Sequence, residues 1–72
     1  MEIKEIWESA SREQRDSLTM LIMMDKVSFS AAYSWCTGAR RPMPLYREKI
    51  RGYVKEVFGI EATVEDLFPE RK

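Results

Sequence analysis

The sequence has no histidine and only one cysteine, Cys36, among its 72 residues. A single cysteine cannot form a disulfide within the chain, and a structural zinc site needs several cysteine or histidine ligands. We therefore expect no disulfide, no bound metal and no cofactor. Enzymatic activity is not expected either, because no histidine can activate Cys36 and because Glu2, Glu5 and Glu8 share a solvated helix face without a pocket around them.

Long apolar runs are also missing. The longest run, residues 20–24, is far shorter than the ~20 residues that cross a bilayer. The chain begins Met-Glu-Ile-Lys-Glu, unlike a secretory signal peptide, so we expect a soluble, cytoplasmic protein without membrane contact. Three methionines in this run, Met20, Met23 and Met24, are expected to fill the core or to form a partner-binding surface, and not to bind copper.

The net charge is zero, since twelve Lys and Arg residues balance twelve Asp and Glu residues. The charges are nevertheless segregated along the chain. Residues 1–25 carry three cations and six carboxylates, residues 26–55 carry seven cations and one carboxylate, and residues 56–72 carry two cations and five carboxylates. A basic middle between acidic ends can direct one face of a protein toward a polyanion such as DNA. A chance distribution of surface charge is the alternative.

Strand patterns are absent, whereas apolar residues recur at helical spacing. Ile3, Ile6, Trp7 and Ala10, for example, follow the i, i+3, i+4, i+7 pattern of one helix face. Trp7 is expected in the core, and would mark a dimer contact if it were exposed. A single domain is predicted for residues 1–72, all-α, as a compact bundle of four to five short helices. The predicted helices cover about residues 2–10, 12–24, 28–37, 44–58 and 63–68.

Helix boundaries are indicated by capping residues. Ser11 with Gln14, and Thr63 with Asp66, have the spacing of a capping box, and Ser28 can cap the third helix. Gly38 is placed to end the third helix, after which Pro42 and Pro44 prevent immediate continuation; Gly59 is placed to end the fourth. Gly52, inside the fourth helix, should cost ~1 kcal/mol relative to alanine unless another backbone packs against it.

The middle of the chain carries a more specific pattern. It reads Val27-Ser28-Phe29-Ser30-Ala31-Ala32-Tyr33-Ser34-Trp35-Cys36-Thr37-Gly38-Ala39-Arg40-Arg41-Pro42. This stretch resembles the Val-Ser-x-x-x-Val-x-x-Trp-x-x-Gly-x-x-x-Pro segment of the lambda-repressor-like helix-turn-helix domains of bacterial and phage regulators. The tail from Phe58 to Phe68 resembles the short closing helix of that family. The resemblance covers about residues 17–68.

The resemblance implies a DNA-binding transcription regulator. The third helix would lie in the major groove of double-stranded DNA, with Val27, Ala32 and Trp35 on its buried side. Its N-terminal cap and outward side chains would face the DNA, namely Ser28, Phe29, Ser30, Tyr33, Ser34 and Thr37. The following loop would place Arg40 and Arg41 on phosphates, with Lys26 and Arg47 as further candidates. A homodimer is expected, because one small module rarely gives enough affinity.

Two positions depart from the family pattern. Lys26 occupies the turn position that is usually glycine, and Ile22 occupies a position on the second helix that is usually alanine. We expect Lys26 to adopt an unfavourable positive φ or to change the turn, and Ile22 to widen the crossing of the helix pair.

A protein-interaction adaptor is the alternative function. No outward residue of the third helix is an Arg, Asn or Gln that could bind a base through two hydrogen bonds, and the net charge is zero. In that case the same scaffold no longer binds DNA, and the methionines and the aromatic face of the third helix dock a protein partner.

Overall fold

A computed structural model describes residues 1–70 of the chain. It contains α1 (Ile3–Ser9), α2 (Arg12–Met23), α3 (Phe29–Cys36), α4 (Pro44–Phe58) and α5 (Val64–Leu67). No strand occurs in this part of the chain. The prediction of an all-α bundle of short helices is therefore confirmed, with the predicted helix ends within one residue of those observed.

The helix starts are set by side chains that bind free backbone amides. Ser11 Oγ accepts from the amide of Gln14 at 3.2 Å, and Gln14 Oε1 accepts from the amide of Ser11 at 2.9 Å. Thr63 and Asp66 form the same reciprocal pair at the start of α5, at 3.1 and 3.3 Å. Both predicted capping boxes are thus present, and each satisfies two amides that have no partner within the helix.

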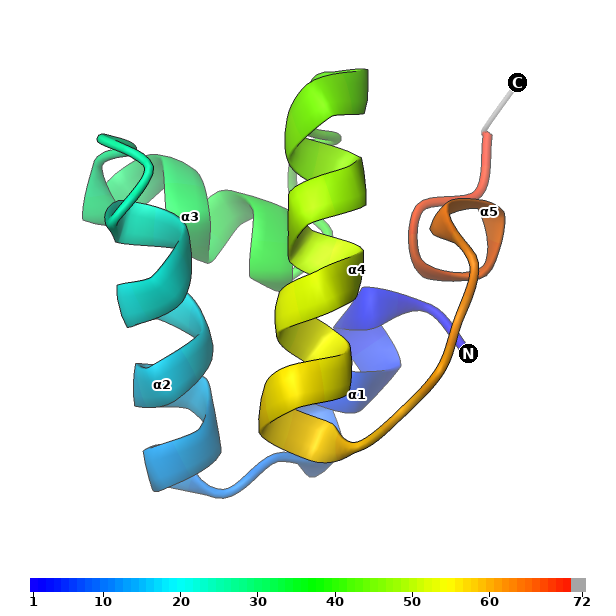
Figure 1. Cartoon of the computed structure of the whole chain (residues 1–72), viewed down its shortest axis with the longest axis horizontal. Coiled ribbons are helices and arrows are strands. Elements are labelled where there is room, and N and C mark those ends of the chain that lie inside the picture. The colour runs from blue at the N-terminus through cyan, green and yellow to red at the C-terminus, as the bar shows by residue number, and fades with distance from the viewer. Residues whose placement is uncertain (71–72) are drawn as a thin grey trace.

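The helices pack around one apolar core. Figure 1 shows α2 and α4 running side by side in opposite directions, with α3 lying across them and α5 close to the N-terminus. The core is built from residues of all five helices: Ile3, Ile6, Trp7, Leu18, Ile22, Ala32, Cys36, Ile50, Val54, Leu67 and Phe68. Trp7 belongs to this core, with 8% of its surface exposed. None of the helices in residues 1–70 is long and apolar enough to cross a membrane.

One expectation about α3 needs correction. Trp35 was expected to be buried, but it is only half-buried at the edge of the core, where its ring lies 5.1 Å from that of Tyr46. The next residue, Cys36, is fully enclosed. Adjacent residues of a helix lie about 100° apart, so Trp35 falls at the edge of the face that Ala32 and Cys36 turn toward the core.

Gly52 has no packing role in this fold. A Cβ built at this position meets no atom within 4 Å, and the residue lies inside α4 on its exposed side. We expect Gly52→Ala to raise the free energy of unfolding by about 1 kcal/mol, because alanine loses less backbone entropy in a helix. Urea unfolding followed by circular dichroism would measure it.

Gly59→Ala is the matched control. Gly59 also has open space around its Cα, but its φ is +68°, a conformation that alanine adopts only with strain. This second variant should lose stability. Equal effects of the two substitutions would contradict the backbone argument.

Candidate nucleic-acid interface

α3 has a buried and an exposed face. Ala32 and Cys36 point into the core, whereas Phe29 and Tyr33 expose 56% and 48% of their surfaces. Of the hydroxyl residues proposed to face DNA, Ser28 and Ser30 are exposed, and Ser34 and Thr37 are half-buried. The face available to a ligand is therefore the N-terminal half of α3.

Internal hydrogen bonds limit what two of these hydroxyl groups can do. Ser28 Oγ accepts from the amide of Ala31 at 3.2 Å, which leaves its proton free to be donated. The Thr37 hydroxyl donates to the carbonyl of Tyr33 at 2.9 Å and can only accept from a ligand. Ser28 is consequently the better of the two as a donor.

The exposed aromatic side chains form a connected row. The rings of Phe29 and Tyr33 lie 5.9 Å apart, and Tyr33 meets the edge of Trp7 at 5.8 Å. The guanidinium of Arg15 lies 5.2 Å from the Trp7 ring centre, and its Nε donates to the Trp7 carbonyl at 2.9 Å. The contact with the buried Trp7 ring thus fixes the position of the Tyr33 ring. The hydrogen bond from Arg15 stabilises the end of α1.

A hollow of about 340 Å³ runs beside this aromatic row and is lined partly by α2. Arg12 and Arg15 line it together with Asp16, Phe29 and Tyr33. Sequence reasoning missed both arginines, because it counted them with the acidic N-terminal segment. Their position at the start of a helix that precedes α3 was the available signal, since the resemblance implies a helix pair whose first helix crosses the DNA backbone.

The loop after α3 folds back on the helix. Gly38 has φ +81°, and the amide of Arg40 donates to the carbonyl of Ser34 at 3.1 Å. The Arg40 side chain is exposed and makes no hydrogen bond or ion pair with residues 1–70. Among the predicted loop residues, Arg40 thus has a backbone fixed by a hydrogen bond and a guanidinium group that is available to a ligand.

Arg41 and Arg47 are engaged within the chain. Arg41 Nη2 donates to the carbonyl of Phe68 at 3.1 Å, and Arg47 Nε donates to the carbonyl of Pro42 at 2.6 Å. These bonds fix the loop to the end of α5 and to the start of α4. Each guanidinium keeps further N–H groups, so both residues combine a structural role with the capacity for a phosphate contact.

Lys4 joins this basic loop from a distant part of the sequence. A Cβ at Gly38 would lie 3.3 Å from Lys4 Cβ, and Lys4 lines a hollow of about 490 Å³ together with Arg40 and Arg41. Glu2 and Glu70 line the same hollow. No sequence signal points to Lys4, because its contact with the loop exists only in the folded chain.

Lys26 lies at the opposite end of α3, in the turn after α2. Its φ is +64°, the only positive φ outside glycine in residues 1–70. The expectation of a positive φ at this position is thus confirmed. Its side chain is exposed.

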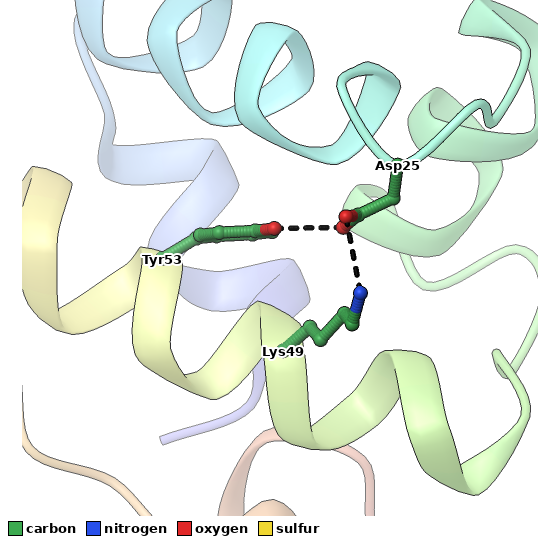
Figure 2. A network of polar contacts seen from close by, with 3 residues as sticks. All are labelled: Asp25, Lys49 and Tyr53. Carbon is green, nitrogen blue, oxygen red and sulfur yellow. Dashed lines mark hydrogen bonds and ion pairs between the residues drawn. The ribbon is translucent and has the colours of Figure 1, made fainter.

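A polar network ties this turn to α4 (Figure 2). Asp25 accepts from the Tyr53 hydroxyl at 2.7 Å and from Lys49 Nζ at 3.1 Å. These two bonds lower the pKa of Asp25, and the bond to Asp25 together with burial raises the pKa of Tyr53 to about 12. The network is therefore intact at neutral pH. It weakens when Asp25 is protonated in acid or when Tyr53 ionises in strong alkali.

Cys36 is the last residue of α3, and its side chain is closed to solvent. Burial raises the pKa of its thiol to about 12, so it is not ionised at neutral pH. Within residues 1–70 no group of three acidic or cysteine side chains could hold a metal ion.

Comparisons of the chain with protein-family models, curated proteins and solved structures found no match.

Proposed function

We propose that the protein is a DNA-binding transcription regulator in which α2 and α3 act as a helix-turn-helix. The observation that carries this proposal is the exposed face of α3, which has an available cation beyond each end of the helix, Lys26 and Arg40. An α-helix with its side chains is about 10–12 Å across, which fits the major groove of B-DNA, about 12 Å wide. Cations at the two ends can then contact phosphates while the face between them meets the bases.

The base-contacting residues are Phe29, Ser30 and Tyr33, with Ser28, Ser34 and Thr37 beside them. Phe29 presents an exposed apolar ring that can press on a thymine methyl group. Ser28 and Ser30 offer hydroxyl groups near the N-terminus of α3, the part of a recognition helix that reaches base edges. Such a face discriminates modestly between bases, so DNA shape would contribute to recognition.

Phosphate contacts are assigned first to Arg40 and Lys26, then to Arg41 and Arg47. Arg12 and Lys4 are added because the fold brings each of them beside a residue of the proposed interface. A homodimer on a two-fold symmetric site would supply the affinity that one small module lacks. The proposed role places the protein in the cytoplasm with bacterial DNA.

The test is fluorescence anisotropy with a pool of random DNA duplexes over a range of salt concentrations. Wild-type binding should weaken steeply with salt. Arg40→Ala should reduce the slope of log K against log salt concentration by about 0.9 for each copy bound, because one phosphate contact is lost. Affinity at low salt should fall by roughly a factor of three to ten.

Lys55→Ala is the matched control. Lys55 is an equally charged, exposed residue near the end of α4, where it pairs with Glu61 at 2.6 Å. Its removal should leave the salt slope unchanged. Absence of binding to any duplex at low salt would contradict the proposal, and so would an equal effect of the two substitutions.

The alternative is a protein-interaction adaptor that uses the same face of α3 without DNA. The specific observation in its favour is the large exposed area of Phe29 and Tyr33, since aromatic side chains often anchor protein interfaces. Capture of a single protein partner that survives nuclease treatment and is abolished by Phe29→Ala would favour this function.

A further inference from the structure

A second apolar surface lies between α2 and α4, away from the proposed DNA interface. It is a groove of about 500 Å³, with Met20, Leu21 and Met24 from α2 and Val57 from α4. Glu13, Gln14, Ser17 and Glu56 complete its lining. It shares no residue with the hollow beside Phe29 and Tyr33, and at 100° per residue the two sets of α2 residues fall on nearly opposite sides of that helix.

The groove divides the methionine run that the sequence presents as a single patch. Met20 and Met24 expose 66% and 78% of their surfaces and line the groove. Met23 is 39% exposed and does not line the groove. Unbranched, polarizable methionine side chains adapt to differently shaped partners, which makes two of them beside an apolar floor suited to docking.

The charges around the groove determine which kind of binding partner it favours. Among residues 1–70 its lining includes two carboxylates, Glu13 and Glu56, and no cation. A two-fold dimer through this groove would place Glu13 and Glu56 of both copies in one interface without cations of the lining to balance them, which is unfavourable. An occupant that places Lys or Arg beside its own apolar side chains would instead be attracted.

The length of the groove indicates the form of that occupant. Along α2 it extends from Glu13 to Met24, about 16 Å, which corresponds to three turns of a helix laid alongside. Amphipathic helices bind such grooves through apolar anchors at i, i+3 or i+4, and i+7. We propose that this groove binds a cationic amphipathic helix of another protein. The inference does not depend on DNA binding by α3.

The probe is an 18-residue peptide of leucine and lysine only, with leucine at these anchor spacings. Protein labelled with 13C in the methionine methyl groups carries five reporters. Titration with the peptide should shift the signals of Met20 and Met24. Met1 and Met43, each 65% exposed but outside the groove, are matched controls and should not shift.

Charge reversal tests the proposed selection. Glu13→Lys with Glu56→Lys should weaken peptide binding at least tenfold and should allow a matched peptide of leucine and glutamate to bind. Glu56→Lys alone leaves the start of α2 unchanged and should weaken binding by a smaller factor. Circular dichroism should show that both variants remain helical.

Two methionine substitutions give an independent measurement. Met24→Ala should weaken binding of the leucine and lysine peptide about fivefold, whereas Met43→Ala should have no effect. Equal shifts at all five methionines, or binding that survives charge reversal, would overturn the proposal. Shifts of Met20 and Met24 that grow with protein concentration alone would assign the groove to a second copy of the chain and would also overturn it. A protein that binds the peptide but not DNA would separate this inference from the proposed function.

Discussion

Replacing Ile22 by alanine is expected to lower the free energy of unfolding by about 2–5 kcal/mol. Ile22 is completely buried in the core, on the helix that packs against both α3 and α4. Loss of its side chain leaves a cavity that the surrounding helices close only in part. Because a core of this size supplies only ~3–5 kcal/mol in total, the variant should be largely unfolded at 37 °C. Urea and thermal unfolding followed by circular dichroism would measure the loss.

Ile22→Val is the conservative comparison and should cost about 0.5–1.5 kcal/mol. The pair of variants also tests the helix-turn-helix resemblance, because alanine is the usual residue at this position in that family. A small effect of Ile22→Ala would show that α2 and α3 can move together into the closer crossing of the family. A large effect would show that the crossing of α2 and α3 in this chain depends on the volume of the isoleucine side chain.

Replacing Gly38 by alanine is expected to cost about 1–2 kcal/mol, a substantial part of the total stability. Gly38 has φ +81°, where a Cβ is strained, and its added carbon would press on Lys4 Cβ at 3.3 Å. The same substitution should move the following loop, whose Arg40 amide binds the Ser34 carbonyl. Unfolding measurements and the DNA anisotropy experiment should therefore both respond, with the loss of stability as the larger effect.

Lys26→Gly is the reciprocal control. Lys26 has φ +64°, so glycine removes strain at this turn and should raise stability by up to about 1 kcal/mol. It also removes one cation proposed to contact phosphate. The variant should therefore be more stable but bind DNA less tightly, a combination that a general weakening of the fold cannot produce. Loss of stability at Lys26→Gly would contradict the strain argument.

The two proposed surfaces differ in electrostatic character. The hollow beside the loop is lined by three cations, Lys4, Arg40 and Arg41, and by two carboxylates, Glu2 and Glu70, whereas the charged residues of the methionine groove are the carboxylates Glu13 and Glu56. A chain with zero net charge can thus present a cationic face to a polyanion and an acidic groove to a cationic helix. Variants of one surface should leave binding at the other unchanged, because the two sets of residues do not overlap.

The sequence by itself determined the secondary structure. Ser11, Ser28 and Thr63 begin α2, α3 and α5, and Gly38 and Gly59 follow the ends of α3 and α4, as their capping chemistry predicts. These features are local: each depends on a hydrogen bond or a backbone angle within a few residues. Helical spacing similarly identified Ile3, Ile6 and Trp7 as core residues of α1, since an apolar face that repeats every three to four residues is stable only when it is buried.

Only the tertiary structure decided which of the predicted site residues have hydrogen-bond partners within the chain. Arg40 and Arg41 are neighbours with the same chemistry in the sequence, yet Arg41 binds a carbonyl 27 residues away while Arg40 is available. Lys4 reaches the same loop through a contact across 34 residues, and Met20 lines the groove between α2 and α4 whereas Met23 does not. Such contacts depend on how helices cross, which composition and periodicity do not specify.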